Sequence, residues 1–207
     1  LWAMVTDAWG TSRLIFGEQR SEWQKYLYDM VCRIVWILPV FALFRRYHSD
    51  LPLSLHELCT WKIRPKLFSV FFLLFTAYAL LSMFFTHGRF RINPEFSWFR
   101  LTTFYLMVGL VEELVYRGWA LNAFSAFMTE RKANLLSTLF FILLHWPAYF
   151  IRLFVTGTLQ TSAFLLQSLV VLVMGLLFGY MFRKSKSIWT PLLLHSYFDW
   201  VVDLLVA

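Results

Sequence analysis

The sequence predicts an all-α fold, a polytopic transmembrane helix bundle of about six spans. Of the 207 residues, 59% are hydrophobic and 20% aromatic, whereas 15% are charged. An average soluble domain has roughly 25% charged residues. The apolar residues also fall in blocks of about 20, the length that a helix needs to cross hydrocarbon roughly 30 Å thick. Composition and block length together exclude an ordinary soluble domain.

The apolar blocks define the expected spans in chain order. They cover residues 26–44, 67–86, 101–127, 133–152, 163–182 and 190–206. The run from Phe71 to Phe75 is apolar without period-two alternation, and lipid accepts only helices or closed barrels, so these blocks predict helices. Residues 1–25 are expected to form a polar N-terminal segment. Residues 26–207 then form a single membrane-embedded domain.

The net charge of +7 raises the question of a nucleic-acid partner. The basic residues lie in short loops between the spans rather than on one continuous face, so we predict no nucleic-acid partner and a lipid bilayer instead. Positive loops stay on the cytoplasmic side. Loops one, three and five, which hold most of these residues, are therefore expected inside.

Several ionisable residues interrupt the last four spans. They are Glu112, Glu113 and Arg117 in span three, His145 in span four, and His195, Asp199 and Asp203 in span six. A charged group at the centre of a span costs about 2.5 to 3.5 kcal/mol on insertion scales. Each of these residues therefore requires a partner or a function.

Helix geometry separates the two adjacent glutamates. Glu113 and Arg117 are four residues apart, so they face the same way and predict a structural ion pair. Glu112 points about 100° around the helix and lacks that partner, which suits it to proton transfer. His195 and Asp199 are also four residues apart, so their side chains share one helix face and can bind one ligand together.

This set of side chains supports peptide hydrolysis. A general base takes a proton from water, and a polar pocket stabilises the developing oxyanion, so no nucleophilic side chain is needed. The sequence contains no GxSG serine motif. His56 and Glu57 are not followed by the second histidine of HExxH, because position 60 is Thr60.

Three short motifs resemble those of a known family in order and spacing. They are Glu112-Glu113-Leu114-Val115-Tyr116-Arg117-Gly118, then Phe141 with His145, then His195 with Asp199. They resemble the motifs of the CPBP family, the CAAX protease and bacteriocin-processing group, also called Abi. The resemblance covers about residues 100–207.

The resemblance implies a glutamic-type intramembrane endopeptidase. Glu112 and His145 would activate water, His195 and Asp199 would line the oxyanion pocket, and Glu113 with Arg117 would hold the shape of the site. CAAX-cleaving members carry Asn where this chain has Asp199. Either Asp199 stays protonated, or it orients His195 and so fixes which ring nitrogen faces the substrate.

The resemblance also bears on cofactors and partners. Some members were described as metalloproteases, and a Glu, two His and an Asp could fill four zinc positions. We predict that no cofactor is needed, with zinc as the alternative. The expected substrate is a peptide or protein near the membrane surface, such as a lipidated C-terminus, a peptide precursor or a sorting tag. The expected location is a bacterial or archaeal cell membrane, in which the protein is multi-pass.

Two other functional classes stay open at this point. One is a non-enzymatic immunity or regulatory membrane protein on the same scaffold. The other is a proton-coupled transporter, because intramembrane carboxylates and histidines also form relays.

The depth of each residue in the membrane limits which of these side chains can meet. Glu112 lies about 16 residues, roughly 24 Å, before the third loop if span three stays α-helical. His195 is much closer to its own loop. The two side chains are therefore expected to meet only if span three bends or ends near Gly118.

Overall fold

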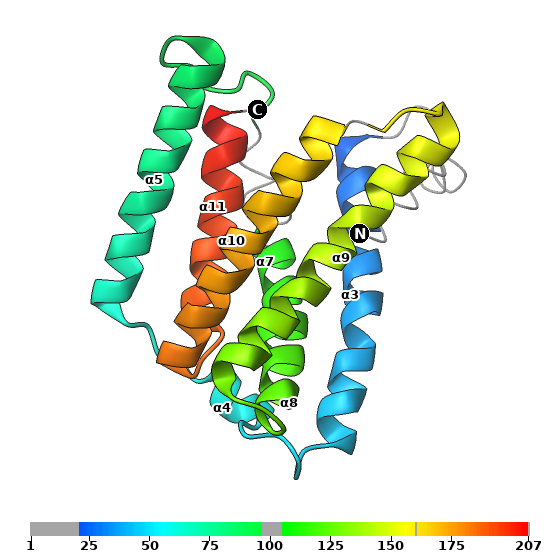
Figure 1. Ribbon diagram of the computed structural model, residues 1–207, viewed down its shortest axis with the longest axis vertical. Helices are drawn as coiled ribbons and strands as arrows, with labels where there is room; N and C mark the ends of the chain where they lie inside the picture. The colour runs from blue at the N-terminus through cyan, green and yellow to red at the C-terminus, as the bar shows by residue number, and fades with distance from the viewer. Residues whose placement is uncertain (1–20, 97–104, 160, 207) are drawn as a thin grey trace.

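The computed structural model describes residues 21–96, 105–159 and 161–206, and these residues form helices and loops without a strand. The elements are α3 (Glu22–Arg46), α4 (Leu55–Cys59), α5 (Pro65–His87), α7 (Leu106–Glu113), the π-helix η2 (Leu114–Leu121), α8 (Asn122–Ser125), α9 (Glu130–Thr156), α10 (Thr161–Ser185) and α11 (Trp189–Leu205) (Figure 1). The all-α prediction is confirmed. Most of the N-terminal segment and the first four residues of the third predicted span lie outside the described residues.

Four described helices are long and apolar enough to cross a membrane. They are Tyr26–Arg46, Pro65–His87, Glu130–Ile151 and Thr161–Ser185. Each of the six predicted blocks coincides with helix. However, α11 has 17 residues, and the third block is divided between α7, η2 and α8. The count of six spans is therefore not confirmed.

Helix α3 begins earlier than the composition suggested. Ser21 caps it, since the Ser21 hydroxyl accepts a hydrogen bond from Gln24 N at 3.3 Å. In return the Ser21 amide donates to Gln24 Oε1 at 2.8 Å. This capping box satisfies two backbone donors at the helix start. The polar segment predicted to reach residue 25 therefore contributes its last residues to α3.

Two glycines bring α10 close to α9. A Cβ added at Gly175 would lie 2.6 Å from Cγ2 of Thr138, and one at Gly179 would lie 1.6 Å from Oδ1 of Asn134. The gap between these helices is thus too narrow for any side chain at either position. Small residues spaced four apart are a common device for close helix contact in membranes.

A third glycine brings α7 close to α11. A Cβ at Gly109 would lie 2.4 Å from Oγ of Ser196 and 3.3 Å from the carbonyl oxygen of Leu192. Gly109 lies about one turn before Glu112 and Glu113 on the same helix. The close approach therefore carries both glutamates toward α11.

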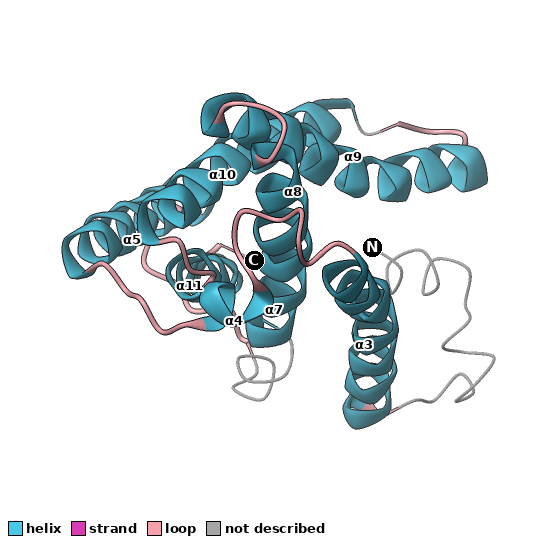
Figure 2. Ribbon diagram, turned by 90° about the horizontal axis from the view of Figure 1, so that it is seen from below, coloured by secondary structure: helices cyan, strands magenta, loops and turns pink. Residues whose placement is uncertain are grey.

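The loops that carry most of the basic residues meet at one end of the bundle. The amide of Ile188, at the start of α11, donates to the carbonyl of Leu58 in α4 at 3.0 Å. Glu130, at the start of α9, pairs with Arg183 at 3.3 Å and with Lys186. Figure 2, which is seen from below, shows α4 beside the start of α11. This arrangement fits the expectation that loops one, three and five share a side.

Candidate active site

The third predicted span changes its helical form just after the two glutamates. Residues Leu114–Leu121 form a π-helix, and the chain stays helical to Ser125, so the span does not end at Gly118. A π-helix has more residues in each turn than an α-helix, and π segments occur often at functional sites. The hydroxyl of Ser137 on α9 donates to the carbonyl of Tyr116 at 2.6 Å and supports this segment. The wider turns shorten the span and reduce the depth difference found from the sequence.

Glu113 and Arg117 form the ion pair that their spacing predicts. Nη1 of Arg117 donates to Oε1 of Glu113 at 2.7 Å, and both side chains are almost completely buried. Nη2 of Arg117 donates to the carbonyl of Gly175 at 3.1 Å. The guanidinium carbon also lies 4.7 Å from the ring centroid of Phe141 and 5.4 Å from that of Phe178. Charge pairing, hydrogen bonds and ring contacts together offset the cost of desolvating this cation.

His195 is oriented by Glu113. Nδ1 of His195 donates to Oε1 of Glu113 at 2.8 Å. The imidazole also stacks on Phe178, with ring centroids 4.7 Å apart and an interplanar angle of 23°. The sequence offered Asp199 as one alternative for orienting His195, but the residue bonded to Nδ1 is Glu113. The close packing of α7 on α11 at Gly109 places a carboxylate from another helix there instead.

The other ring nitrogen of His195 faces two carboxylates. Nε2 lies 3.7 Å from Oε2 of Glu112 and 3.6 Å from Oδ2 of Asp199. Both distances exceed that of a direct hydrogen bond and suit an atom that bridges the groups. The side chain of Asp199 is 28% exposed, compared with 10% for Glu112. Asp199 therefore marks the more open side of this cluster.

His145 lies beside the cluster on α9. Its Nδ1 donates to the carbonyl of Phe141 at 2.8 Å. A carbonyl only accepts, so in the neutral form the proton is on Nδ1 and Nε2 is an acceptor. The His145 ring packs edge-on against Phe141, with ring centroids 4.9 Å apart. The ring centroid of His195 lies 6.1 Å from that of the same phenyl ring. No hydrogen bond joins His145 to Glu112 in the described part of the chain.

One charged residue near the cluster was missed in the sequence. Arg33 lies on α3, inside the candidate span Tyr26–Arg46, and its charge acts on Asp199. The sequence itself indicates this residue, because an arginine within an apolar span requires a functional explanation.

Among residues 21–96, 105–159 and 161–206, no group of three or more His, Cys, Asp or Glu side chains is arranged to hold a metal ion.

The helices long enough to span a membrane surround a buried cluster of acid and histidine side chains, which defines the class of a membrane-embedded protein. A family model described as type II CAAX prenyl endopeptidase Rce1-like matches residues 94–201, more than half of the chain. The chain belongs to this family, which is the CPBP family that its motifs resemble. It is an integral membrane protease of the CAAX type, with a peptide or protein substrate. Searches of curated proteins and of solved structures found no match.

Proposed function

We propose that this protease hydrolyses a peptide bond near the membrane surface with a water molecule activated by Glu112 and His145, and without a metal. One observation carries the proposal. His195, held through Nδ1 by Glu113 at 2.8 Å, presents Nε2 at 3.7 Å from Oε2 of Glu112. A base and a potential oxyanion donor therefore face one gap, in which a water or substrate oxygen can contact both groups without lying on the line between them.

Glu112 is the proposed general base. Its side chain is 10% exposed, so few water molecules compete for its oxygens. The carboxylate takes a proton from one water molecule as the water oxygen attacks the carbonyl carbon of the substrate. His145 provides a second acceptor through Nε2. When the carbon–nitrogen bond breaks, the proton passes to the departing amine, and the products are a free acid and a free amine.

His195 and Asp199 are the proposed oxyanion donors. A neutral His195 with its proton on Nδ1 would turn the Nε2 lone pair toward two carboxylates, which is unfavourable if both are ionised. A further proton on one of the three groups removes this repulsion. A proton on Nε2 of His195 or on the Asp199 carboxyl points a donor at the gap, where it stabilises a developing negative charge.

A lipidated or membrane-anchored segment is the substrate that we favour. The matching family is described as acting on CAAX prenyl substrates. Exposed apolar side chains cover α3, α5 and α10, so a lipid chain on the substrate can remain in the bilayer while the peptide reaches the site. The same helices make the protein multi-pass in this proposal.

A cleavage assay tests substrate and mechanism together. The purified protein would receive peptides that end in a prenylated cysteine followed by three residues, and matched peptides without the lipid. We expect mass spectrometry to show cleavage of the lipidated peptide, with no loss of rate after treatment with a chelator. Stoichiometric zinc in active protein, with activity lost on chelation and restored by zinc, would instead assign the reaction to a metal-bound water.

A further inference from the structure

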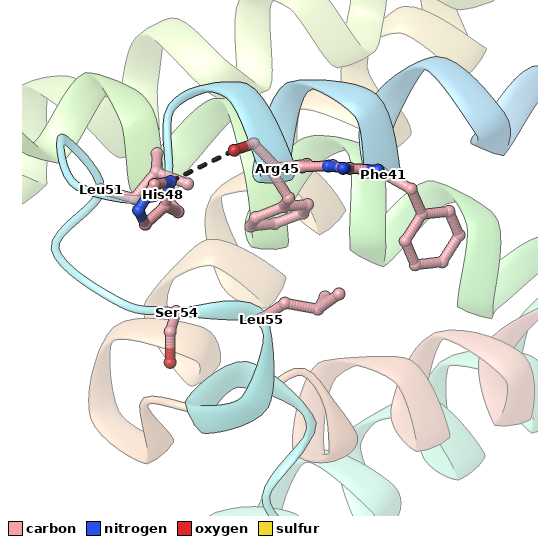
Figure 3. A pocket seen from close by; sticks show the side chains of 7 residues that line it. Phe41, Arg45, His48, Leu51, Ser54 and Leu55 are labelled. Atoms are coloured by element: carbon pink, nitrogen blue, oxygen red, sulfur yellow. Dashed lines mark hydrogen bonds between the residues drawn. The ribbon is translucent and has the colours of Figure 1, made fainter.

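A pocket of about 220 Å³ lies at the end of α3 that carries the basic residues (Figure 3). None of the active-site residues lines it. Its walls combine the apolar side chains of Phe41, Phe44, Leu51 and Leu55 with the polar side chains of Arg45 and His48. No Asp or Glu lines this pocket. The pocket therefore has an apolar interior and a positively charged rim.

Arg45 supplies the positive charge of the rim. Within the described part of the chain, its guanidinium has no hydrogen-bond or ion-pair partner. Nδ1 of His48 donates to the Arg45 carbonyl at 3.2 Å, as the dashed line in Figure 3 shows, whereas the Arg45 side chain extends the other way, toward Phe41. That bond leaves Nε2 of His48 for another partner. A phosphate group would match the Arg45 guanidinium, since arginine binds phosphate oxygens in a bidentate manner.

The position of the pocket along α3 favours a lipid as the source of that phosphate. Arg45 lies one residue from the end of the candidate span Tyr26–Arg46, where lipid headgroups are found. An exposed apolar stripe, formed by Phe41, Leu38, Ile34 and Val31, continues from the pocket along one face of the helix. An acyl chain can lie on this stripe while its phosphate reaches Arg45 at the rim of the pocket.

The floor of the pocket contacts η2, which directly follows Glu112 and Glu113 in the chain. Phe44 is 5% exposed and packs edge-on against Trp119 of η2, with ring centroids 5.4 Å apart. A ligand that touches α3 and residues 51–55 at once would hold this packing in place. Binding to the folded state alone raises the melting temperature.

We propose that this pocket and its rim bind an anionic phospholipid, with the phosphate on Arg45 and one acyl chain along the stripe. Basic pockets between membrane helices are known to recognise such headgroups. This inference does not depend on the proposed catalytic mechanism. It concerns a separate surface of the protein.

The test compares four proteins in non-ionic detergent: wild type, Arg45→Gln, Phe41→Ala and, as the matched control, Arg46→Gln. Arg46 neighbours Arg45 and carries the same charge, but it does not line the pocket. Native mass spectrometry and melting temperature would be measured with added phosphatidylglycerol, phosphatidylcholine or inorganic phosphate. We expect phosphatidylglycerol to bind best and to raise the melting temperature of the wild type.

Arg45→Gln should weaken phosphatidylglycerol binding about tenfold, as expected when a charge-assisted bond worth about 1.4 kcal/mol or more is lost. Phe41→Ala should also weaken it, whereas Arg46→Gln should leave it near the wild-type value. Equal losses in Arg45→Gln and Arg46→Gln would overturn the proposal in favour of diffuse attraction to basic residues. A similar rise in melting temperature with inorganic phosphate or with phosphatidylcholine would also overturn it.

Discussion

Oε1 of Glu113 accepts hydrogen bonds from Nη1 of Arg117 at 2.7 Å and from Nδ1 of His195 at 2.8 Å. One carboxylate oxygen thus links the start of the π-helix to α11, across 82 positions of sequence. Because Glu113 fixes Nδ1, it also determines that Nε2 of His195 faces Glu112. The adjacent glutamates therefore contact different atoms of His195, since Glu113 bonds Nδ1 and Glu112 faces Nε2.

Glu112→Gln should abolish cleavage without unfolding the protein. The amide keeps the shape and volume of the side chain but cannot accept a proton as a base does, and general-base catalysis contributes about 10²- to 10⁴-fold in rate. Cleavage of the lipidated peptide and the melting temperature in detergent would be measured. Wild-type cleavage by this variant would mean that the base has been assigned to the wrong residue.

Glu113→Gln should lower stability as well as activity. It leaves the buried Arg117 without its anionic partner, and breaking a buried pair typically costs about 3 to 5 kcal/mol. Adding Arg117→Met removes the unpaired charge, so the double variant should regain part of the melting temperature. It should not regain cleavage, because His195 still lacks its carboxylate. The same Arg117→Met change added to Glu112→Gln serves as the control and should bring no such recovery.

Asp199→Asn should retain cleavage, whereas Asp199→Leu should lose most of it. A carboxamide can donate to an oxyanion in the place of a protonated carboxyl, while leucine cannot. Loss of one oxyanion donor typically lowers kcat by about 10²- to 10³-fold. Steady-state kinetics of both variants would separate kcat from KM. Equal losses in the two variants would show that the acid itself is needed, as a proton carrier.

Gly109→Ala should disturb the site from a distance. The new methyl group would lie 2.4 Å from Oγ of Ser196, and overpacking of this kind typically costs about 1 to 3 kcal/mol. Pushing α7 away from α11 also moves both glutamates away from His195. Ser196→Ala removes the closest contact, so Gly109→Ala with Ser196→Ala should recover part of the stability and part of the cleavage. If Gly109→Ala alone matches the wild type in both measurements, the close approach of the two helices is not required.

The sequence could predict the features that depend on local composition and spacing. The six apolar blocks correspond to helices because the length of an apolar run decides whether a helix fits the bilayer. The ion pair of Glu113 with Arg117 follows from residues four apart on one helix. The three motifs led to the family, whose model matches residues 94–201.

The tertiary structure decided which side chains meet. Three features join segments that are distant in sequence or separated by a turn of the chain. They are the hydrogen bond between Glu113 and His195, the electrostatic effect of Arg33 on Asp199 and the pocket beside Arg45. They depend on how closely helices approach, which Gly109 and Gly175 set by lacking a side chain. They depend also on the π-helical turns after Glu113, which alter the phase of the helix. Hydrophobic periodicity records only which face of a helix is apolar, so it predicted the helices but not the contacts that assemble the site.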